Sequence, residues 1–282
     1  MSPSHPAHRR QPAQVYRLRR ALAATGVVLV VFAIANIAGG GDGDGAAPIA
    51  IPESTTTTTI PPLPACADGD VVVLEDPAEA WATVMIDTAR ALPAQFGPPD
   101  LHNIADAGFP FTDGLAVRSL VVADLGALRQ AAADNGTPLS ILAAYRSHAR
   151  QAELFGQRVE ELGDIEAGSR VARPGHSEHQ LGTTIDVTTE GDTDVDQSWG
   201  ATPHGQWVAT NAHKYGFLLS YPMEAAERTC FDYEPWHLRY VGRELAADVI
   251  ASGLSLREYL WELNPIDNTT TTTTLPATTT DP

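Results

Sequence analysis

Two histidines and an aspartate in the second half of the chain have the residue types and spacing of a metal-binding set. His179 and Asp186 lie within Pro174–Asp186 (PGHSEHQLGTTID), and His237 ends Glu234–His237 (EPWH). Imidazole and carboxylate groups together suit zinc, and a catalytic zinc site keeps three protein ligands and one position for water. Asp186 also stands in a β-branched run, where a carboxylate is costly unless it is paired or metal-bound. The sequence therefore predicts a zinc site at these three residues.

The neighbouring residues favour a hydrolytic use of this site. Glu234 precedes His237 closely enough to act as general base for a water molecule at the metal. Pro235 lies between them and disfavours a helix there, so a strand or bend is expected. Gly182 lets the chain turn between the first histidine and the aspartate. Taken singly, a histidine of this kind is more often a surface or hydrogen-bonded residue, so the prediction depends on the whole set.

The elements that must position these residues are helices and short strands in no regular alternation. Apolar or β-branched runs predict strands over Leu139–Tyr145, Thr183–Thr188, Phe217–Tyr221 and Glu234–Val241. Helices are expected after Asp76-Pro77 as far as Leu92, over Arg118–Asn135, from Ser147 to about Leu162, and over Gln206–Tyr215, Arg243–Ser252 and Leu256–Leu263. This mixture predicts an α+β domain with a small, mainly antiparallel sheet flanked by helices.

The charge of the chain is acidic overall and unevenly placed. Its 282 residues carry a formal net charge of −17, which argues against nucleic acid as a partner. Residues 1–20 instead contain arginines and no acidic residue, and Ala21–Ala38 is uncharged and almost wholly apolar. We expect a basic cytoplasmic segment over residues 1–20 and a transmembrane signal anchor over residues 21–38. The alternative is a secretory signal peptide cleaved after Ala33-Ile34-Ala35.

The exported part divides by composition. Residues 39–64 are rich in Gly, Thr and Pro and predict an extended linker, and residues 266–282 predict a Thr- and Pro-rich tail. Residues 65–265 remain as one domain that contains the predicted zinc site. Cys66 and Cys230 are the only cysteines. In an exported chain two thiols most often form a disulfide, and the alternative is two free buried thiols.

Several ordered motifs together resemble the VanY-like D-alanyl-D-alanine carboxypeptidases, which belong to a wider group with lysostaphin-type and hedgehog-type zinc domains. The family pattern is S-x-H-x-x-G-x-x-x-D followed by E-x-W-H. This chain matches it with Ser177, His179, Gly182 and Asp186, and then with Glu234, Trp236 and His237. The segments Tyr145–Ser147 (YRS) and Gly216–Pro222 (GFLLSYP) are also similar, so the resemblance covers most of residues 115–245.

The resemblance implies a hedgehog/DD-peptidase-like fold and a role for each residue. His179, Asp186 and His237 would bind Zn²⁺, and Glu234 would be the general base. Arg146 would bind the terminal carboxylate of the substrate, because a guanidinium offers two parallel donors to one carboxylate. Ser177 and Gln151 would be further substrate-binding residues of the pocket.

The implied activity is that of a zinc-dependent D,D- or L,D-carboxypeptidase that trims peptidoglycan stem peptides. It would act from the cell membrane with an extracytoplasmic catalytic domain, or as a secreted protein if the apolar segment is cleaved. One alternative is a peptidoglycan endopeptidase. Another is a non-catalytic, hedgehog-like zinc domain, and Glu234 argues against it because a binding module has no need of a general base.

Overall fold

The computed structural model describes residues 55–59, 62–66, 72–74, 78–110, 114–263 and 270–274. It divides into two compact units, one of which spans Ile60–Thr269 and contains every element discussed below except one pair of strands. That pair, in the other unit, is β1 (Thr55–Thr59) and β10 (Thr270–Thr274), which run antiparallel. β1 falls in the predicted linker and β10 in the predicted tail, and the sequence did not predict that they would pair.

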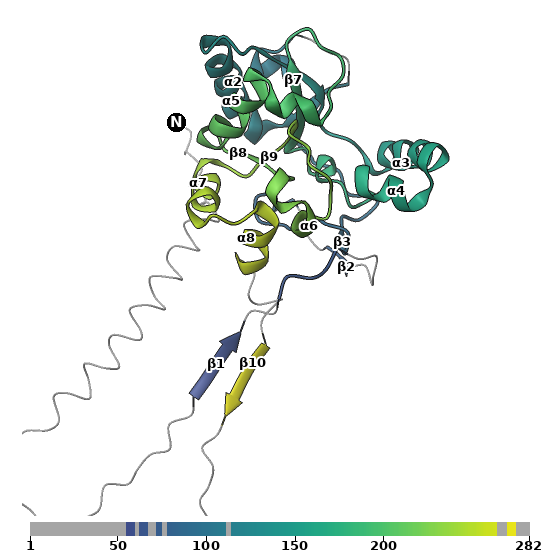
Figure 1. Ribbon diagram of the computed structural model, residues 1–282, viewed down its shortest axis with the longest axis vertical. Helices are drawn as coiled ribbons and strands as arrows, with labels where there is room; N and C mark the ends of the chain where they lie inside the picture. Colours follow the sequence, from purple (N-terminus) through teal and green to yellow (C-terminus); the bar gives the residue numbers. More distant parts are fainter. Residues whose placement is uncertain are drawn as a thin grey trace, which may run out of the picture. The chain divides into compact units, whose positions relative to one another are not determined.

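The centre of the larger unit is a four-stranded antiparallel sheet (Figure 1). Its strand order is β6 (Leu139–Ala143), β7 (Thr184–Thr189), β9 (His237–Tyr240) and β8 (Phe217–Leu219). Successive side chains of a strand point to opposite faces. Ile185, Val187 and Leu238 accordingly belong to the main core, and the alternate residues Asp186 and His237 lie on the other face. One face of the sheet therefore packs on the main core, and the other face carries the candidate ligands.

Helices complete the cores on either side of this sheet. α2 (Ser119–Asp134) and α5 (Pro203–Asn211) contribute apolar side chains to the main core, and α7 (Arg243–Ser252) and α8 (Leu256–Leu263) form a second one. The other elements are β2 (Val72–Val73), β3 (Arg90–Ala91), β4 (Leu101–Asn103), η1 (Ile104–Ala107), β5 (Ala116–Arg118), η2 (Glu178–Leu181), η3 (Gln197–Ala201), η4 (Ala212–Tyr215), η5 (Met223–Ala225) and α6 (Ala226–Thr229). The predicted α+β class is confirmed.

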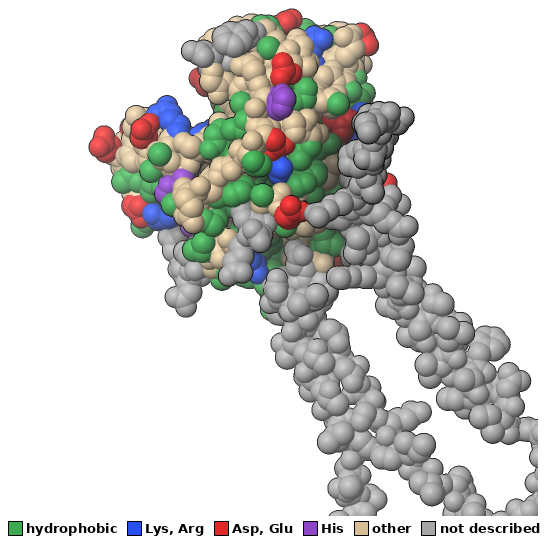
Figure 2. Space-filling model, turned by 180° about the vertical axis from the view of Figure 1, so that it is seen from behind, with side chains coloured by type: hydrophobic (Ala, Val, Ile, Leu, Met, Phe, Trp, Pro, Cys, Tyr) green, Lys and Arg blue, Asp and Glu red, His purple; other side chains and the backbone are tan. Residues whose placement is uncertain are grey.

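α3 (His148–Leu162) and α4 (Asp164–Arg170) pack against each other and project to one side of the sheet (Figure 1). Figure 2 shows acidic and basic side chains close together on this projecting lobe. They include short-range ion pairs such as Arg150–Glu153 and Arg158–Glu161. Exposed pairs of this kind contribute little stability. The buried residues of the two helices are Gln151, Phe155 and Ala167.

Most of the predicted helices are confirmed, and one is wrong. Ser147 caps α3 as expected, since its hydroxyl accepts a hydrogen bond from the backbone N–H of Arg150. Asp76 and Pro77 lie outside the described residues. From residue 78 to residue 92, where the same helix was expected to continue, the chain instead forms turns and β3. The carbonyls of Trp81 and Val84 are directed to the buried guanidinium of Arg239, which takes them out of any helical ladder.

The structure does not test the predicted membrane anchor. Within the described ranges, no helix is long and apolar enough to cross a bilayer. Residues 1–20 and 21–38 lie outside those ranges. The cytoplasmic segment and the signal anchor therefore stay predictions from the sequence.

Candidate active site

The central sheet places two of the predicted ligands side by side. Asp186 of β7 pairs directly with His237 of β9. His179 comes from η2, which ends at Gly182 in a left-handed conformation (φ 70°) before the chain enters β7. A Cβ at Gly182 would lie 3.0 Å from Pro98, so the turn requires glycine both for its φ and for its space. One ligand atom from each of the three predicted residues lies within 4.8 Å of the others.

The contacts of these three residues fit a zinc ion. His179 Nδ1 lies 2.7 Å from the carbonyl oxygen of Ala144, which leaves Nε2 directed at Asp186 Oδ2, 3.3 Å away. Asp186 Oδ1 is buried and makes no hydrogen bond of good geometry, although His237 Nδ1 lies 3.2 Å from it. A buried carboxylate oxygen without a hydrogen bond is costly unless something else binds it. Two imidazoles and one carboxylate are a donor set that zinc accepts.

The electrostatics of the set also favour a cation. Burial raises the pKa of the Asp186 carboxyl, but the two imidazoles outweigh burial and hold the pKa well below its ordinary value. Burial lowers the pKa of His237, but the surrounding carboxylates outweigh it and raise the pKa to about 10. Positive charge is therefore strongly favoured beside Asp186, which is the place that a metal ion would take.

Glu234 lies beside this set in the turn that leads into β9. Its backbone N–H donates to the carbonyl of Tyr221, and its own carbonyl accepts from the N–H of His237, so this stretch is the bend that Pro235 predicted. Glu234 Oε2 is 3.5 Å from His237 Nδ1. Burial raises the pKa of Glu234 to about 8, although His237 and Arg146 oppose the rise. A carboxyl group in this position can hold and release a proton near neutral pH.

Arg146 follows β6 and points into the same region. Its Nη1 donates to Gln151 Oε1 at 2.9 Å, and its Nη2 is 3.7 Å from Asp186 Oδ2. Gln151 is 1% exposed, and its amide nitrogen donates to the carbonyl of Ala172. The fixed amide of Gln151 therefore orients the guanidinium, which retains further donors for a substrate.

One cavity of about 170 Å³ brings all seven predicted site residues together. These are Arg146, Gln151, Ser177, His179, Asp186, Glu234 and His237. Their proximity is a finding, and the roles assigned to them stay predictions. The sequence gave no site role to the other lining residues, which include Leu154, Arg170, Val171, Ala172, Tyr221, Phe231 and Trp236. Tyr221 and Trp236 stand in motifs that mark the resemblance, whereas Leu154, Arg170, Val171 and Ala172 lie in α3 and α4 or directly after α4.

A buried group behind the ligands was also missed. Glu178, in η2, accepts hydrogen bonds from Ser220 Oγ at 2.6 Å and from Arg239 Nη1 at 2.8 Å, and its Oε2 lies 3.0 Å from His237 Nε2. Burial raises the pKa of Glu178, but these partners outweigh it and lower the pKa to about 2. Strand alternation could have indicated Arg239, which shares a face of β9 with His237.

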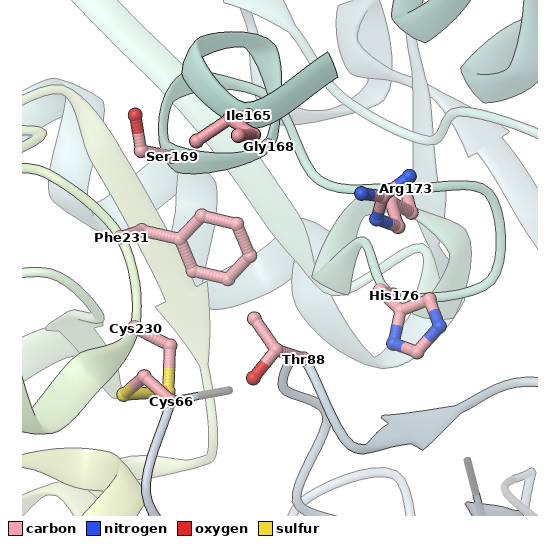
Figure 3. Close-up of a pocket in the computed structure, with 9 residues that line it drawn as sticks. All are labelled: Cys66, Thr88, Ile165, Gly168, Ser169, Arg173, His176, Cys230 and Phe231. Atoms are coloured by element: carbon pink, nitrogen blue, oxygen red, sulfur yellow. A yellow bond between two sulfur atoms is a disulfide. The ribbon is translucent and has the colours of Figure 1, made fainter. Parts of the chain in front are cut away.

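The predicted disulfide is confirmed. Cys66 and Cys230 are bonded, which excludes the alternative of two free thiols. Figure 3 shows the bonded pair beside a second cavity of about 240 Å³, across which lie residues of α4. Phe231, next to Cys230, lines both this cavity and the one that holds the predicted ligands. The disulfide therefore fixes the chain one residue away from a wall of the candidate site.

Known proteins resemble this chain in sequence and in fold. Residues 114–243 match the family VanY, D-alanyl-D-alanine carboxypeptidase. A D-alanyl-D-alanine carboxypeptidase of Enterococcus faecalis is 30% identical over 226 residues, which are 72% of this chain and 80% of the relative. The solved structure of the LdcB LD-carboxypeptidase is 34% identical with a TM-score of 0.62, over 67% of this chain and 89% of that one. A vancomycin resistance D,D-pentapeptidase VanY in complex with Zn(II) is 28% identical with a TM-score of 0.55, over 64% of this chain and 99% of that one.

The fold and the site thus define a peptidase of the carboxypeptidase class. More particularly, the chain belongs to the VanY family of D-alanyl-D-alanine carboxypeptidases. The family prediction made from the motifs is confirmed.

Proposed function

We propose that this chain is a zinc-dependent carboxypeptidase that removes a C-terminal D-alanine from peptidoglycan stem peptides. The observation that carries the proposal is the meeting of His179, Asp186, His237, Glu234 and Arg146 in one cavity. The substrate class is supported by the family and by the D,D- and LD-carboxypeptidases to which the chain is similar. The bond cleaved is the terminal D-Ala-D-Ala bond or the L,D bond one step further in.

The residues of the cavity divide the work of peptide hydrolysis. His179, Asp186 and His237 would hold zinc, which when bound polarises a peptide carbonyl and lowers the pKa of water to about 7. Glu234 Oε2 takes a proton from the attacking water and passes it to the nitrogen of the leaving amino acid. A single carboxyl can make both transfers if it stays within hydrogen-bond reach of both atoms.

Arg146 gives this hydrolysis its preference for chain ends. Gln151 accepts from Nη1 of its guanidinium, and Nη2 lies 3.7 Å from Asp186, which is too far for a hydrogen bond. The guanidinium therefore keeps donors that can bind the terminal carboxylate of a peptide. A free C-terminus is thereby held a fixed distance from Glu234 and the ligands. This arrangement favours removal of the last residue over cleavage inside a chain.

We also propose that the enzyme acts outside the cytoplasm. The Cys66–Cys230 disulfide fits an oxidising compartment. The arginines before the apolar residues 21–38 fit a single-pass anchor. The mass of the mature protein, recovered from the membrane fraction and from the culture medium, tests this proposal. An intact N-terminus in the membrane fraction supports the anchor, and a shortened protein in the medium indicates a cleaved signal peptide. Recovery of the protein from the cytoplasmic fraction alone would overturn the proposal.

The test of the activity uses the full-length protein and synthetic stem peptides with mass detection. Loss of one alanine from a pentapeptide ending in D-Ala-D-Ala, abolished by a chelator and by Glu234→Ala, supports a D,D-carboxypeptidase. Loss of D-alanine from a tetrapeptide instead identifies an L,D-carboxypeptidase. No cleavage of either peptide by the zinc-bound protein would overturn the proposal, and cross-linked peptidoglycan would then test for an endopeptidase.

A further inference from the structure

The two predicted histidine ligands turn opposite ring nitrogens toward Asp186, and each has a different partner on its other nitrogen. His179 Nδ1 faces the carbonyl of Ala144, so Nε2 is directed toward Asp186. His237 has the reverse orientation, with Nε2 on Glu178 and Nδ1 toward Asp186. The two rings are nearly perpendicular, with an interplanar angle of 87° and centroids 5.0 Å apart. Which nitrogen of His237 can bind a metal therefore depends on whether Glu178 accepts a hydrogen bond from Nε2.

Glu178 is bound on both of its oxygens. Oε1 accepts from Arg239 Nη1, and Oε2 accepts from Ser220 Oγ and lies 3.0 Å from His237 Nε2. Glu178 is 4% exposed and Arg239 is 0% exposed. The ion pair with Arg239 uses one oxygen, so it does not account for the contact that the other oxygen makes with His237.

Arg239 is itself fixed from the other side by the segment before the family-matched region. Its Nη2 donates to the carbonyls of Trp81 at 3.1 Å and Val84 at 2.7 Å. The family match begins at residue 114. A continuous series of hydrogen bonds thus connects the turns at residues 81–84, through Arg239 and Glu178, to His237.

We propose that Glu178 is a positioning residue for the metal site: fixed by Arg239 and Ser220, it accepts the Nε2 proton of His237 and presents the Nδ1 lone pair toward Asp186 and His179. A carboxylate behind a ligating histidine fixes the tautomer and the ring orientation, and its loss typically weakens metal binding about 10- to 100-fold. The inference rests on the proposed ligand set, and it gives the turns at residues 81–84 a part in supporting that set.

The first test compares two buried acid-to-amide changes in the full-length protein. Glu178→Gln leaves one oxygen where two are needed. Asp87→Asn is the matched control, because Asp87 is 1% exposed and its carboxylate binds Arg257 at 2.7 Å, outside the ligand set. The measurement is the zinc dissociation constant by competition with a chromogenic chelator, beside the melting temperature. Both variants should have a lower melting temperature than the unmodified protein. Only Glu178→Gln should weaken zinc binding, by about 10- to 100-fold.

Equal zinc affinity in both variants and the unmodified protein would overturn the inference and leave the proposed function standing. Failure of the unmodified protein to bind zinc would instead overturn the proposed function, and the inference with it.

A second measurement avoids the risk that Glu178→Gln does not fold. In the unmodified, zinc-loaded protein, nitrogen NMR of the histidine rings should show His237 protonated on Nε2 and metal-bound through Nδ1. His179 should show the reverse assignment. A metal bond through Nε2 of His237 would overturn the inference whatever the variants do.

Discussion

Arg146 supplies the most informative prediction, because its role can be separated from that of the metal. Each hydrogen bond to a charged partner contributes about 1.5–3 kcal/mol, and a guanidinium can make two to one carboxylate. The Arg146 side chain is 19% exposed, and one of its donors already binds Gln151. We therefore take a value near the lower end for the pair, about 3 kcal/mol, which corresponds to about 100-fold in kcat/KM.

The assay is a thermodynamic cycle that combines a substitution of Arg146 in the enzyme with a change of the C-terminal group of the peptide. The unmodified protein should cleave a free-acid stem peptide about 100-fold more efficiently than the same peptide with a C-terminal amide. Arg146→Ala should remove nearly all of this preference, because the group that distinguishes the two peptides is gone. Arg146→Lys should retain part of it, since lysine keeps the charge but not the planar pair of donors.

Zinc content is measured on every variant of this cycle. Arg146→Ala should keep its zinc, because Arg146 is not one of the three predicted ligands. If the variant retains the full preference for the free acid, or loses zinc in proportion to activity, the assignment of Arg146 to the substrate carboxylate is wrong.

The remaining predictions concern the base, the support of Arg146, the disulfide and the metal. Glu234→Gln should lower kcat by about 10²–10⁴ with zinc retained, and near-normal turnover would refute the base assignment. Gln151→Leu should raise KM for free-acid peptides more than it lowers kcat, because it frees Arg146 to rotate; an unchanged KM would contradict this. Reduction of Cys66–Cys230, which are 164 residues apart, should lower the melting temperature, since the chain-entropy relation gives an upper value of about 5 kcal/mol for such a loop. A chelator should also lower the melting temperature, because zinc present at 1,000 times its dissociation constant stabilises the folded protein by about 4 kcal/mol. An unchanged melting temperature would count against a bound metal.

Local signals were sufficient wherever an element depends on residues a few positions apart. Ser147 caps α3 through its own hydroxyl, and Gly182 turns the chain because only glycine tolerates that φ without strain. α7 and α8 have the bounds that the sequence predicted. The same local reasoning was wrong for residues 78–92, where apolar side chains recur near helical spacing but the carbonyls bind a distant arginine.

The chemistry of the ligands was readable because residue type limits what a site can do. Two imidazoles, a carboxylate and a nearby glutamate indicate metal-assisted hydrolysis before any fold is known. The sequence alone therefore determined the family, the predicted ligands and the predicted base.

Only the tertiary structure decided how those residues are supported. The contact of Glu178 with His237 joins residues 59 positions apart, and that of Arg239 with Val84 joins residues 155 apart. No spacing in the sequence records such pairs, because they depend on strand register and on which side chains are excluded from water together. The sequence thus determined which groups are present for the reaction, and the packing of the sheet determined their orientation, because hydrogen bonds between buried polar groups form only where folding brings both partners out of water.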